Sequence, residues 1–345
     1  MTSTPLSLGF HFPAEFEKHD ATWLSWPHKE ASWPGKIESI YPAYSLFVRL
    51  LAQSETVHIN VANEAMKEMA IQHLARAGID LSTIRFHFNP TNDAWCRDHG
   101  PAFLVNRKAG KKVIVDWGYN AWGEKYPPYD LDDIVPTRIA REMDLPVYNP
   151  GIVMEGGSVE FNGDGTLLTT SSCLLNKNRN PQLSQKEIEE YLRQYYGAEQ
   201  MFWLGDGIAG DDTDGHIDDI TRFVNADSVV TVVEENKTDV NYEPLQKNLK
   251  SLKKLRLNNK PLTIIELPMP APVIYEDQRL PASYANFYIC NRYVIVPTFR
   301  DKNDYRALEI LQQAFPKHEI AGIDSVDIIW GLGSFHCLSQ QEPAL

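Results

Sequence analysis

Residues 213–233 read TDGHIDDITRFVNADSVVTVV, in which a polar, glycine-containing segment runs into two stretches rich in valine, isoleucine and phenylalanine. Residues of these types favour strands, so the stretch predicts a polar loop followed by a strand, a turn and a second strand. Four other stretches follow a similar plan, at residues 94–115, 155–170, 283–299 and 331–341. Within them, Asn162-Gly163-Asp164-Gly165 and Asn291-Arg292 separate β-rich runs and predict hairpin turns.

Helical patterns lie between these stretches. Apolar residues recur at i, i+3 and i+4 spacing in residues 37–53, 64–77, 132–144, 184–196 and 304–315. Ser184 followed by Glu187 forms a capping-box signature at the start of one of them. The chain therefore alternates strand pairs with helices.

The strand pairs recur at a loose period. One polar residue taken from each stretch recurs after 51 to 70 residues, in the order Asp98, Glu155, His216, Asn286, Cys337. A strand–strand–helix unit of this period predicts a pseudo-symmetric α/β ring whose loops meet at a shared axis. A generic α/β domain with scattered loops is the alternative. No low-complexity tract or linker divides the chain, so we expect residues 1–345 to form a single domain.

Composition excludes several classes of protein. Of 345 residues, 43% are hydrophobic, which is enough for a substantial core and excludes wholesale disorder. The 46 acidic and 33 basic residues give a net charge of −13, which disfavours nucleic acid and anionic lipid and favours cationic ligands such as amines and guanidines. No run of 18 apolar residues and no signal-like N-terminus occurs, so we expect a cytoplasmic protein that does not use the membrane.

Two stretches place a carboxylate beside glycine. Asp98 lies in Trp95-Cys96-Arg97-Asp98-His99-Gly100-Pro101, at the mouth of a predicted strand, and a local ion pair with Arg97 is the alternative to a functional role. Glu155 precedes Gly156-Gly157, which allow close approach of the backbone or a positive φ. The alternative there is a tight turn with an exposed Glu155.

His216 and Asp218 lie in the segment richest in acidic residues, 205–219. The spacing does not fit an EF-hand calcium loop. If 216–218 is extended, the two side chains share a face, and the carboxylate raises the pKa of the imidazole toward the range of a general acid and base. A solvated acidic loop is the alternative.

Cys337 follows Gly331-Leu332-Gly333-Ser334-Phe335-His336 near the C-terminus, in a predicted strand. A lone cysteine is more often a buried hydrophobe than a nucleophile, and in a strand His336 would point away from it. Cys96, Cys173 and Cys290 lie in or beside apolar runs and are predicted to be structural.

Two other classes of function compete with a cysteine enzyme. A metallohydrolase could use His99, His216, Asp218 and His336, although the chain has no HExxH or clustered HxH signature and no CxxC pair. A non-catalytic binding module is compatible with the composition.

Taken together, the segments resemble the agmatine deiminase and bacterial, Porphyromonas-type peptidyl-arginine deiminase family of the guanidine-modifying (pentein) superfamily. The resemblance runs nearly end to end. Its motifs are PAEFEKHDATWLSWP (13–27), DAWCRDHGP (93–101), DWGYNAWG (116–123), MEGGS (154–158), GTLLTTSSCLLNKNRNP (165–181), DGHIDD (214–219), ANFYICNRYVIVPTF (285–299) and FHCLSQQEP (335–343). It implies a five-bladed α/β propeller of ββαβ units around a central active site.

The resemblance also implies roles for residues. Cys337 corresponds to the nucleophile and His216 to the general acid and base. Asp98 and Asp218 correspond to the pair that grips the guanidinium, and Glu155 to the glutamate that orients the histidine and contacts the substrate nitrogens. Trp95 is similar in position to an aromatic near the substrate. No metal and no organic cofactor are implied.

The implied reaction is hydrolysis of agmatine to N-carbamoylputrescine and ammonia through a covalent amidino-thioether on Cys337. Two departures from the family pattern lie beside functional positions: His99 replaces the threonine of RDTGP, and GLGSFHC (331–337) replaces GGGNIHC. A peptidyl-arginine or another arginine derivative is therefore the alternative substrate. The acidic loop 206–214 is interpreted as an amine-binding segment or as solvated surface. The sequence leaves the oligomeric state open, a homo-oligomer included.

Overall fold

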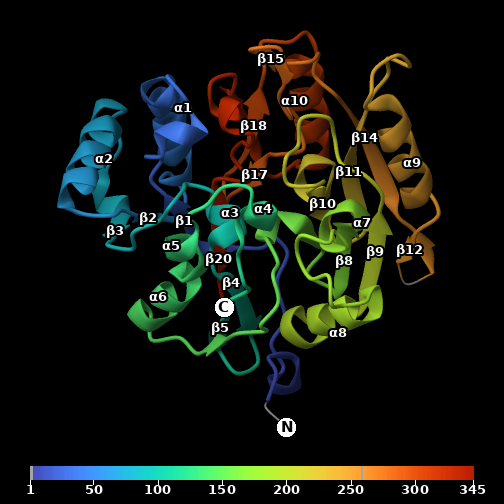
Figure 1. Ribbon diagram of the computed structural model, residues 1–345, viewed down its shortest axis with the longest axis horizontal. Helices are drawn as coiled ribbons and strands as arrows, with labels where there is room; N and C mark the ends of the chain where they lie inside the picture. The colour runs from blue at the N-terminus through green and yellow to red at the C-terminus, as the bar shows by residue number, and fades with distance from the viewer. Residues whose placement is uncertain (1–2, 258) are drawn as a thin grey trace.

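The computed structural model describes residues 3–257 and 259–345 and is a mixed α/β protein (Figure 1). Four three-stranded sheets in this part of the chain share one connectivity: two antiparallel strands, a helix, and a third strand parallel to the second. They are β4–β5–β6 (Ala102–Asn106, Lys111–Val115, Val147–Tyr148), β7–β8–β9 (Val159–Phe161, Thr166–Thr170, Gln200–Leu204), β10–β11–β14 (Thr221–Asn225, Ser228–Val233, Thr263–Pro268) and β17–β18–β19 (Tyr288–Ile289, Tyr293–Thr298, Glu319–Asp324).

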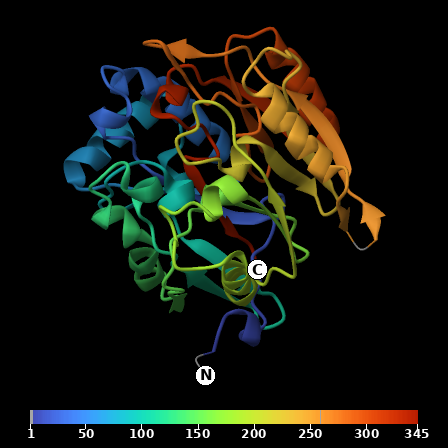
Figure 2. The same ribbon diagram turned by 45° about the vertical axis from the view of Figure 1, so that its right-hand side comes forward.

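A further sheet joins the two ends of the chain. β20 (Ser339–Pro343) pairs antiparallel with β1 (His19–Ser25), and β1 continues in parallel pairing to β2 (Thr56–Asn60) and then β3 (Ile84–His87). Figures 1 and 2 both show the red C-terminal strand beside the blue N-terminal one. The strand-like stretch expected within 331–341 overlaps β20, and the antiparallel partner of β20 comes from the other end of the chain.

The longer helices lie around the rim in Figure 1. They are α1 (Ile37–Leu51), α2 (Glu64–Arg76), α6 (Val135–Glu142), α8 (Gln185–Tyr196), α9 (Tyr242–Leu252) and α10 (Asn303–Ala314). Apolar spacing predicted all but α9, whose buried stripe is interrupted by the polar Asn248. The predicted helix 132–144 divides into α5 (Asp130–Asp133) and α6. α8 begins with the predicted capping box between Ser184 and Glu187.

Short elements complete the described chain. The short helices are η1 (Leu6–Leu8), η2 (Glu30–Ser32), η3 (Leu81–Thr83), α3 (Cys96–His99), α4 (Ala121–Glu124), η4 (Gly156–Ser158), α7 (Ser171–Leu174), η5 (Ile217–Asp219) and η6 (Ile328–Gly331). Two small hairpins are β12–β13 (Arg256–Leu257, Lys260–Pro261) and β15–β16 (Ile274–Tyr275, Gln278–Arg279). The predicted turns at 162–165 and 291–292 are confirmed, because they join β7 to β8 and β17 to β18. Among the residues described, no helix combines the length and the apolar character that crossing a bilayer requires.

The hydrophobic core lies between the rim helices and the sheets. In the N-terminal sheet, α1 buries Tyr44, Phe47 and Leu51 against Val57 and Ile59 of β2. Burying an aliphatic or aromatic side chain of this size stabilises the fold by roughly 1.5–3 kcal/mol. The short helices α3, η4 and η5 precede the first strands β4, β7 and β10, and η4 contacts both α3 and η5. The fold thus brings three polar loop segments together.

Candidate active site

The predicted functional residues lie at the starts of four sheets. Asp98 is in α3, Glu155 caps η4, His216 caps η5, and Cys337 lies in the turn just before β20. Asp218 is inside η5. The structure therefore collects at one place residues that are far apart in the sequence.

The extended backbone considered for 216–218 and the strand expected at Cys337 are turns instead. Ile217–Asp219 is a 3-10 turn closed by a hydrogen bond from the Ile220 amide to the Ile217 carbonyl, and Cys337 lies before the strand, not in it. Extended backbone at these positions would need a neighbouring strand to satisfy its amides. The turn makes its bonds locally, and it leaves His216 and Asp218 both facing the interior of the protein, where both are fully buried.

Gly157 is the point on which three of these segments converge. A Cβ added to it would lie 2.6 Å from Nδ1 of His216, 2.8 Å from Oδ1 of Asp98 and 3.0 Å from Oδ2 of Asp218. No real Cβ has neighbours this close, so only glycine fits. This confirms the prediction that glycine after Glu155 permits close approach of the backbone.

Asp98 is held by neutral donors. Its Oδ1 accepts a hydrogen bond from the Gly157 amide at 2.9 Å, and its Oδ2 accepts one from Nε1 of Trp122 at 2.9 Å. Burial raises the pKa of Asp98 to about 6; His216 opposes this rise, and Asp218 and Glu155 add to it. Asp98 therefore titrates close to neutral pH, and the alternative of a local ion pair with Arg97 is excluded because Arg97 pairs with Glu15.

His216 is fully buried beside Asp98. Its Nδ1 lies 3.7 Å from Oδ1 of Asp98, and in the described part of the chain neither ring nitrogen has a hydrogen-bond partner. Burial lowers the pKa of His216, but Asp98, Cys173 and Asp218 together hold it well above the usual 6.5. The predicted upward shift is confirmed, although its largest electrostatic source is Asp98 and not Asp218, the neighbour in sequence.

Cys337 is a buried thiol among carboxylates. Nδ2 of Asn286 donates to its sulfur at 3.0 Å, and Oδ2 of Asp218 lies 3.6 Å from the sulfur. Burial raises the pKa of the Cys337 thiol well above 9.0, with further increases from Asp218, Asp219 and Asp98. The thiolate therefore needs added positive charge in the site.

Glu155 lies close to His216. Nε of Arg179 donates to its Oε1 at 2.6 Å, and its Oε2 is buried with no partner in residues 3–257 or 259–345. Atoms of Glu155, Cys173 and His216 all lie within 4.8 Å of one another, so these are the side chains here that could hold a metal ion. His99, Asp218 and His336 lie outside this group, so it differs from the expected metallohydrolase set. Cys173 is buried as predicted, but it adjoins His216.

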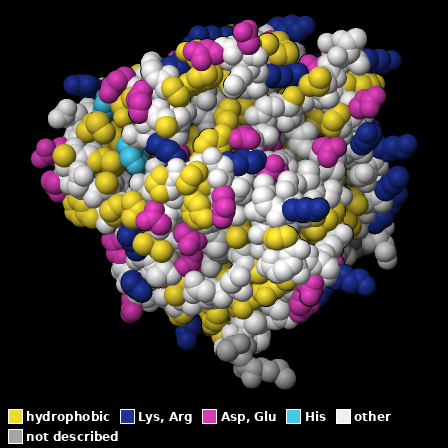
Figure 3. All heavy atoms as spheres, in the orientation of Figure 1, with side chains coloured by type: hydrophobic (Ala, Val, Ile, Leu, Met, Phe, Trp, Pro, Cys, Tyr) yellow, Lys and Arg dark blue, Asp and Glu magenta, His cyan; other side chains and the backbone are white. Residues whose placement is uncertain are grey.

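A pocket of about 200 Å³ opens onto Cys337 and Asp98. Trp95 and Trp122 line it, and Asp212 is among the lining residues of its outer part. In Figure 3, acidic and basic side chains are interspersed near the centre of the face shown. Aromatic faces and carboxylates suit a small organic cation. The pocket includes Trp95, as predicted.

The geometry agrees with comparisons to known proteins. Residues 11–343 match the family model of Porphyromonas-type peptidyl-arginine deiminases. The agmatine deiminase of Pseudomonas aeruginosa (strain LESB58) is 36% identical over 99% of this chain and 98% of its own.

The chain belongs to the Porphyromonas-type peptidyl-arginine deiminase family. Among solved structures, the agmatine deiminase of Enterococcus faecalis superposes with a TM-score of 0.92 at 33% identity, covering 100% of this chain and 98% of that one. A substrate-bound cysteine-to-serine form of the C. jejuni agmatine deiminase superposes with a TM-score of 0.88 at 34% identity, covering 96% of each chain.

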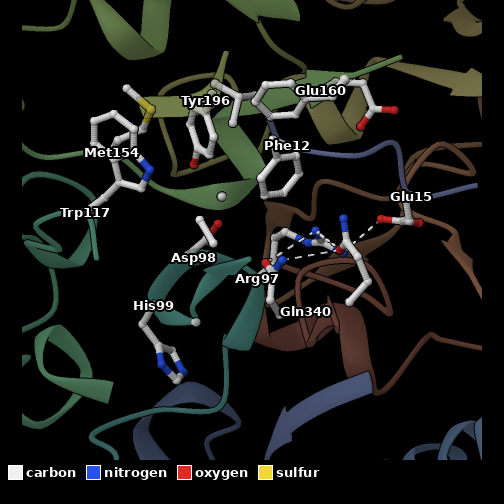
Figure 4. Close-up of a pocket in the computed structure, with 16 residues that line it drawn as sticks. Phe12, Glu15, Arg97, Asp98, His99, Trp117, Met154, Glu160, Tyr196 and Gln340 are labelled. Atoms are coloured by element: carbon white, nitrogen blue, oxygen red, sulfur yellow. Dashed lines mark hydrogen bonds and ion pairs between the residues drawn. The ribbon is translucent and has the colours of Figure 1, made fainter. Parts of the chain in front are cut away.

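The two departures from the family pattern lie at different places. His99 is buried, with Nε2 3.4 Å from Oγ of Ser25, and burial lowers its pKa to about 3. It does not line the large pocket but is among the residues that line a smaller cavity of about 30 Å³, and in Figure 4 its ring points away from Asp98. Gly331, Leu332 and Gly333, by contrast, line the large pocket beside Cys337. The second departure is therefore the one that lines this pocket.

The acidic loop is largely bonded within the protein. Asp211 accepts hydrogen bonds from Thr213 and from the His216 amide, and Asp214 pairs with Arg179 and Lys125. The interpretation of the whole loop as solvated surface is therefore wrong.

Sequence reasoning missed several partners of the site. Trp122 and Arg179 lie in stretches noted only for their family resemblance, and Asn286 served only as a spacing landmark. A signal existed for Trp122, because it lies in the compact run Asp116–Gly123. Glu15, which contacts His336, likewise lies in a quoted stretch, 13–27, but nothing there pointed to its pairing with His336.

Proposed function

We propose that this protein hydrolyses agmatine to N-carbamoylputrescine and ammonia. The observation that carries the proposal is the meeting of Cys337, His216, Asp98 and Asp218 around Gly157, next to a pocket of small-molecule size. Full-length similarity to agmatine deiminases supports the choice of substrate.

Two carboxylates would hold the guanidinium. Asp98 and Asp218 flank the site, and Oδ1 of Asp218 is buried without a partner among the described residues. A guanidinium is planar and always charged, and its N–H groups match carboxylate oxygens in direction. The carbon of the guanidinium would then face the sulfur of Cys337.

Substrate binding also favours ionisation of the nucleophile. The carboxylates that raise the pKa of Cys337 are those that the substrate cation would neutralise, so the cation lowers that pKa when it binds. The thiolate attacks the guanidinium carbon and forms a C–S bond. The imidazolium of His216 then gives its proton to one NH₂ group, the C–N bond breaks, and ammonia leaves.

The second half of the reaction regenerates the enzyme. Neutral His216 takes a proton from water, and the resulting hydroxide adds to the carbon of the amidino-thioether. The C–S bond then breaks, and the proton of the added hydroxyl passes to sulfur as the ureido C=O forms. The proton that Cys337 released to solvent on ionising combines with the departed ammonia, so each turnover yields one ammonium ion and returns Cys337 as the thiol.

A direct assay tests the proposal. Purified protein is incubated with agmatine, free arginine or an arginine-containing peptide, each with and without chelator, and ammonia and ureido product are measured. Turnover of agmatine that chelator does not change is the expected result. Turnover of the peptide alone would favour the peptidyl-arginine alternative, and loss of activity in chelator would favour a metal enzyme based on Glu155, Cys173 and His216.

We also propose that residues 1–345 form one catalytic domain and that its five larger sheets are the blades of a propeller around the site. The shared strand order and the pairing of β20 with β1 support this arrangement. The family match over residues 11–343 supports a single unit. Limited proteolysis tests whether the chain is a single domain. If it is, cleavage should release no fragment that stays folded by itself.

A further inference from the structure

His336 is a buried imidazole between two carboxylates. Its Nδ1 lies 2.6 Å from Oδ2 of Asp218, and its Nε2 lies 2.8 Å from Oε2 of Glu15. An ionised carboxylate only accepts hydrogen bonds, so two such partners require both ring nitrogens to donate. The geometry is therefore that of an imidazolium joining Glu15 to Asp218.

Glu15 is anchored on every side. Its Oε2 also accepts from Nη2 of Arg97 at 2.9 Å, and its Oε1 accepts from Nη2 of Arg222 at 2.9 Å and from the Ile289 amide at 2.8 Å. Figure 4 shows the ion pair between Glu15 and Arg97. Although burial opposes it, Arg222, His336 and Arg97 hold the pKa of Glu15 well below 4.5. Glu15 is thus a fixed, ionised support.

The hydrogen bond from His336 determines which oxygen of Asp218 is available to a substrate. It occupies Oδ2, which is also the oxygen nearest the sulfur of Cys337, and leaves Oδ1 buried and unpartnered in the described chain. A carboxylate buried near other carboxylates would otherwise take up a proton or rotate. Burial does raise the pKa of Asp218, but His336 is the largest of the groups that bring it below 3.8.

We propose that Glu15 and His336 are positioning residues that keep Asp218 ionised and oriented with Oδ1 toward the substrate guanidinium. This inference rests on the proposed function, since it concerns the same carboxylate and the same substrate class. Glu15 and His336 are not among the residues that line the pocket beside Cys337. They act only through Asp218.

The readout is the acid limb of the pH profile, that is, the decline in kcat/KM at low pH. A purely structural role of Glu15 and His336 would not shift it. Cationic groups facing Asp218 are His336, His216 and Arg222, and the carboxylates facing it are Asp98, Asp211 and Asp219, with the thiol of Cys337 also adjacent. In the wild type, the limb is set by Asp98, whose pKa is about 6. Removing the cation of His336 raises the pKa of Asp218, because burial and the three carboxylates then dominate.

The test compares His336→Gln with wild type. We expect kcat/KM for agmatine to fall about 10²-fold at neutral pH, the size of loss that misplacing a catalytic group by an ångström produces. The acid limb should move to higher pH and become steeper, since two carboxyls would now titrate. In a Cys337→Ser background, calorimetry should show weaker agmatine binding with the same pH trend.

Two further variants separate the positioning role from a general disturbance of the fold. His58→Asn removes a half-buried histidine of β2, hydrogen-bonded to His87 and far from the site, and should leave the limb unmoved. Glu15→Gln keeps the size of the support but removes its charge, and should shift the limb in the same direction by less. If His336→Gln does not fold, Glu15→Gln decides the question.

The two proposals fail in different ways. A wild-type protein that does not turn over agmatine contradicts the proposed function. An active wild type with folded His336→Gln or Glu15→Gln variants whose acid limb matches the wild type overturns the positioning role.

Discussion

Asp98 and Asp218 form two walls of the candidate site, and the protein holds these two carboxylates in opposite ways. Asp98 receives hydrogen bonds from neutral donors, the Gly157 amide and Trp122, and its pKa is raised to about 6. Asp218 receives a hydrogen bond from His336, and its pKa is lowered. Both are fully buried, so burial alone does not separate them. The partner's charge decides whether a buried carboxyl is ionised at the pH of the reaction.

Removing the nucleophile should have the largest effect and leave both walls intact. Cys337→Ala should lower kcat on the order of 10⁶-fold, the loss expected when the nucleophile of a covalent hydrolase is removed. Because the two carboxylates remain, agmatine should still bind. Steady-state assays and calorimetry check the two halves of this statement, and substantial residual turnover would contradict the covalent mechanism.

Placing a methyl group between the walls should be the next most damaging change. Gly157→Ala puts a Cβ within 3.0 Å of atoms of His216, Asp98 and Asp218, so these groups must separate. We expect kcat/KM to fall about 10²-fold or more, with the secondary structure retained. Gly205→Ala is the matched control for folding, because neither glycine has a positive φ and a Cβ at Gly205 meets only Oδ1 of Asn248, at the ordinary contact distance of 3.4 Å. Wild-type kinetics in Gly157→Ala would contradict the convergence of the three side chains.

Replacing each carboxylate by a neutral amide should lower the unfolding free energy by different amounts at the two walls. Asp218→Asn leaves His336 without its anionic partner on that side, and removing one member of a buried ion pair costs about 3–5 kcal/mol of unfolding free energy. Asp98→Asn also removes an anion, the one nearest to His216, but that pair lies at 3.7 Å without a hydrogen bond and His216 can lose its proton, so its cost should be smaller. Denaturant unfolding at neutral pH measures both. Equal costs would contradict the contrast drawn above, whatever happens to activity.

The smallest expected effect comes from a substitution next to Asp98. Trp122→Phe removes one donor, so the pKa of Asp98 should rise further, since a hydrogen bond to the ionised form lowers it. Activity needs ionised Asp98, so it declines as pH falls through about 6 in the wild type, and in the variant the decline should begin at higher pH. A loss of about tenfold or less near neutral pH should largely recover in alkaline buffer. A pH-independent loss would instead indicate that Trp122 contacts the substrate.

Local patterns in the sequence predicted a large part of the architecture. The hairpin turns at 162–165 and 291–292, the capping box of α8 and five of the longer helices follow from residue type and apolar spacing alone. α9 escaped because Asn248, a polar residue, fills its buried face and bonds to the Gly205 amide and the Asp206 carbonyl. The pairing of β20 with β1 escaped because no local pattern joins the two ends of a chain.

For the site, the motifs identified Cys337, His216, Asp98, Asp218, Glu155 and Trp95, and the structure gathers these residues in one region. The catalytic role of each stays a prediction. Residues 216–218, for which an extended backbone was considered, and Cys337, for which a strand was expected, are in turns. The His216 amide bonds locally to Asp211 and Thr213, whereas the Cys337 amide donates to Oδ1 of Asn286. The support from Glu15 through His336 was invisible in the sequence, since the two residues lie at opposite ends of the chain.

The sequence by itself determined which chemical groups this protein possesses and which local segments carry them, because hydrogen bonding and apolar spacing within a segment need no distant partner. Only the tertiary structure decided which of those groups are charged. Burial and the charge of the nearest partner set each pKa, and for Asp98, Asp218 and Cys337 those partners come from segments remote in the chain.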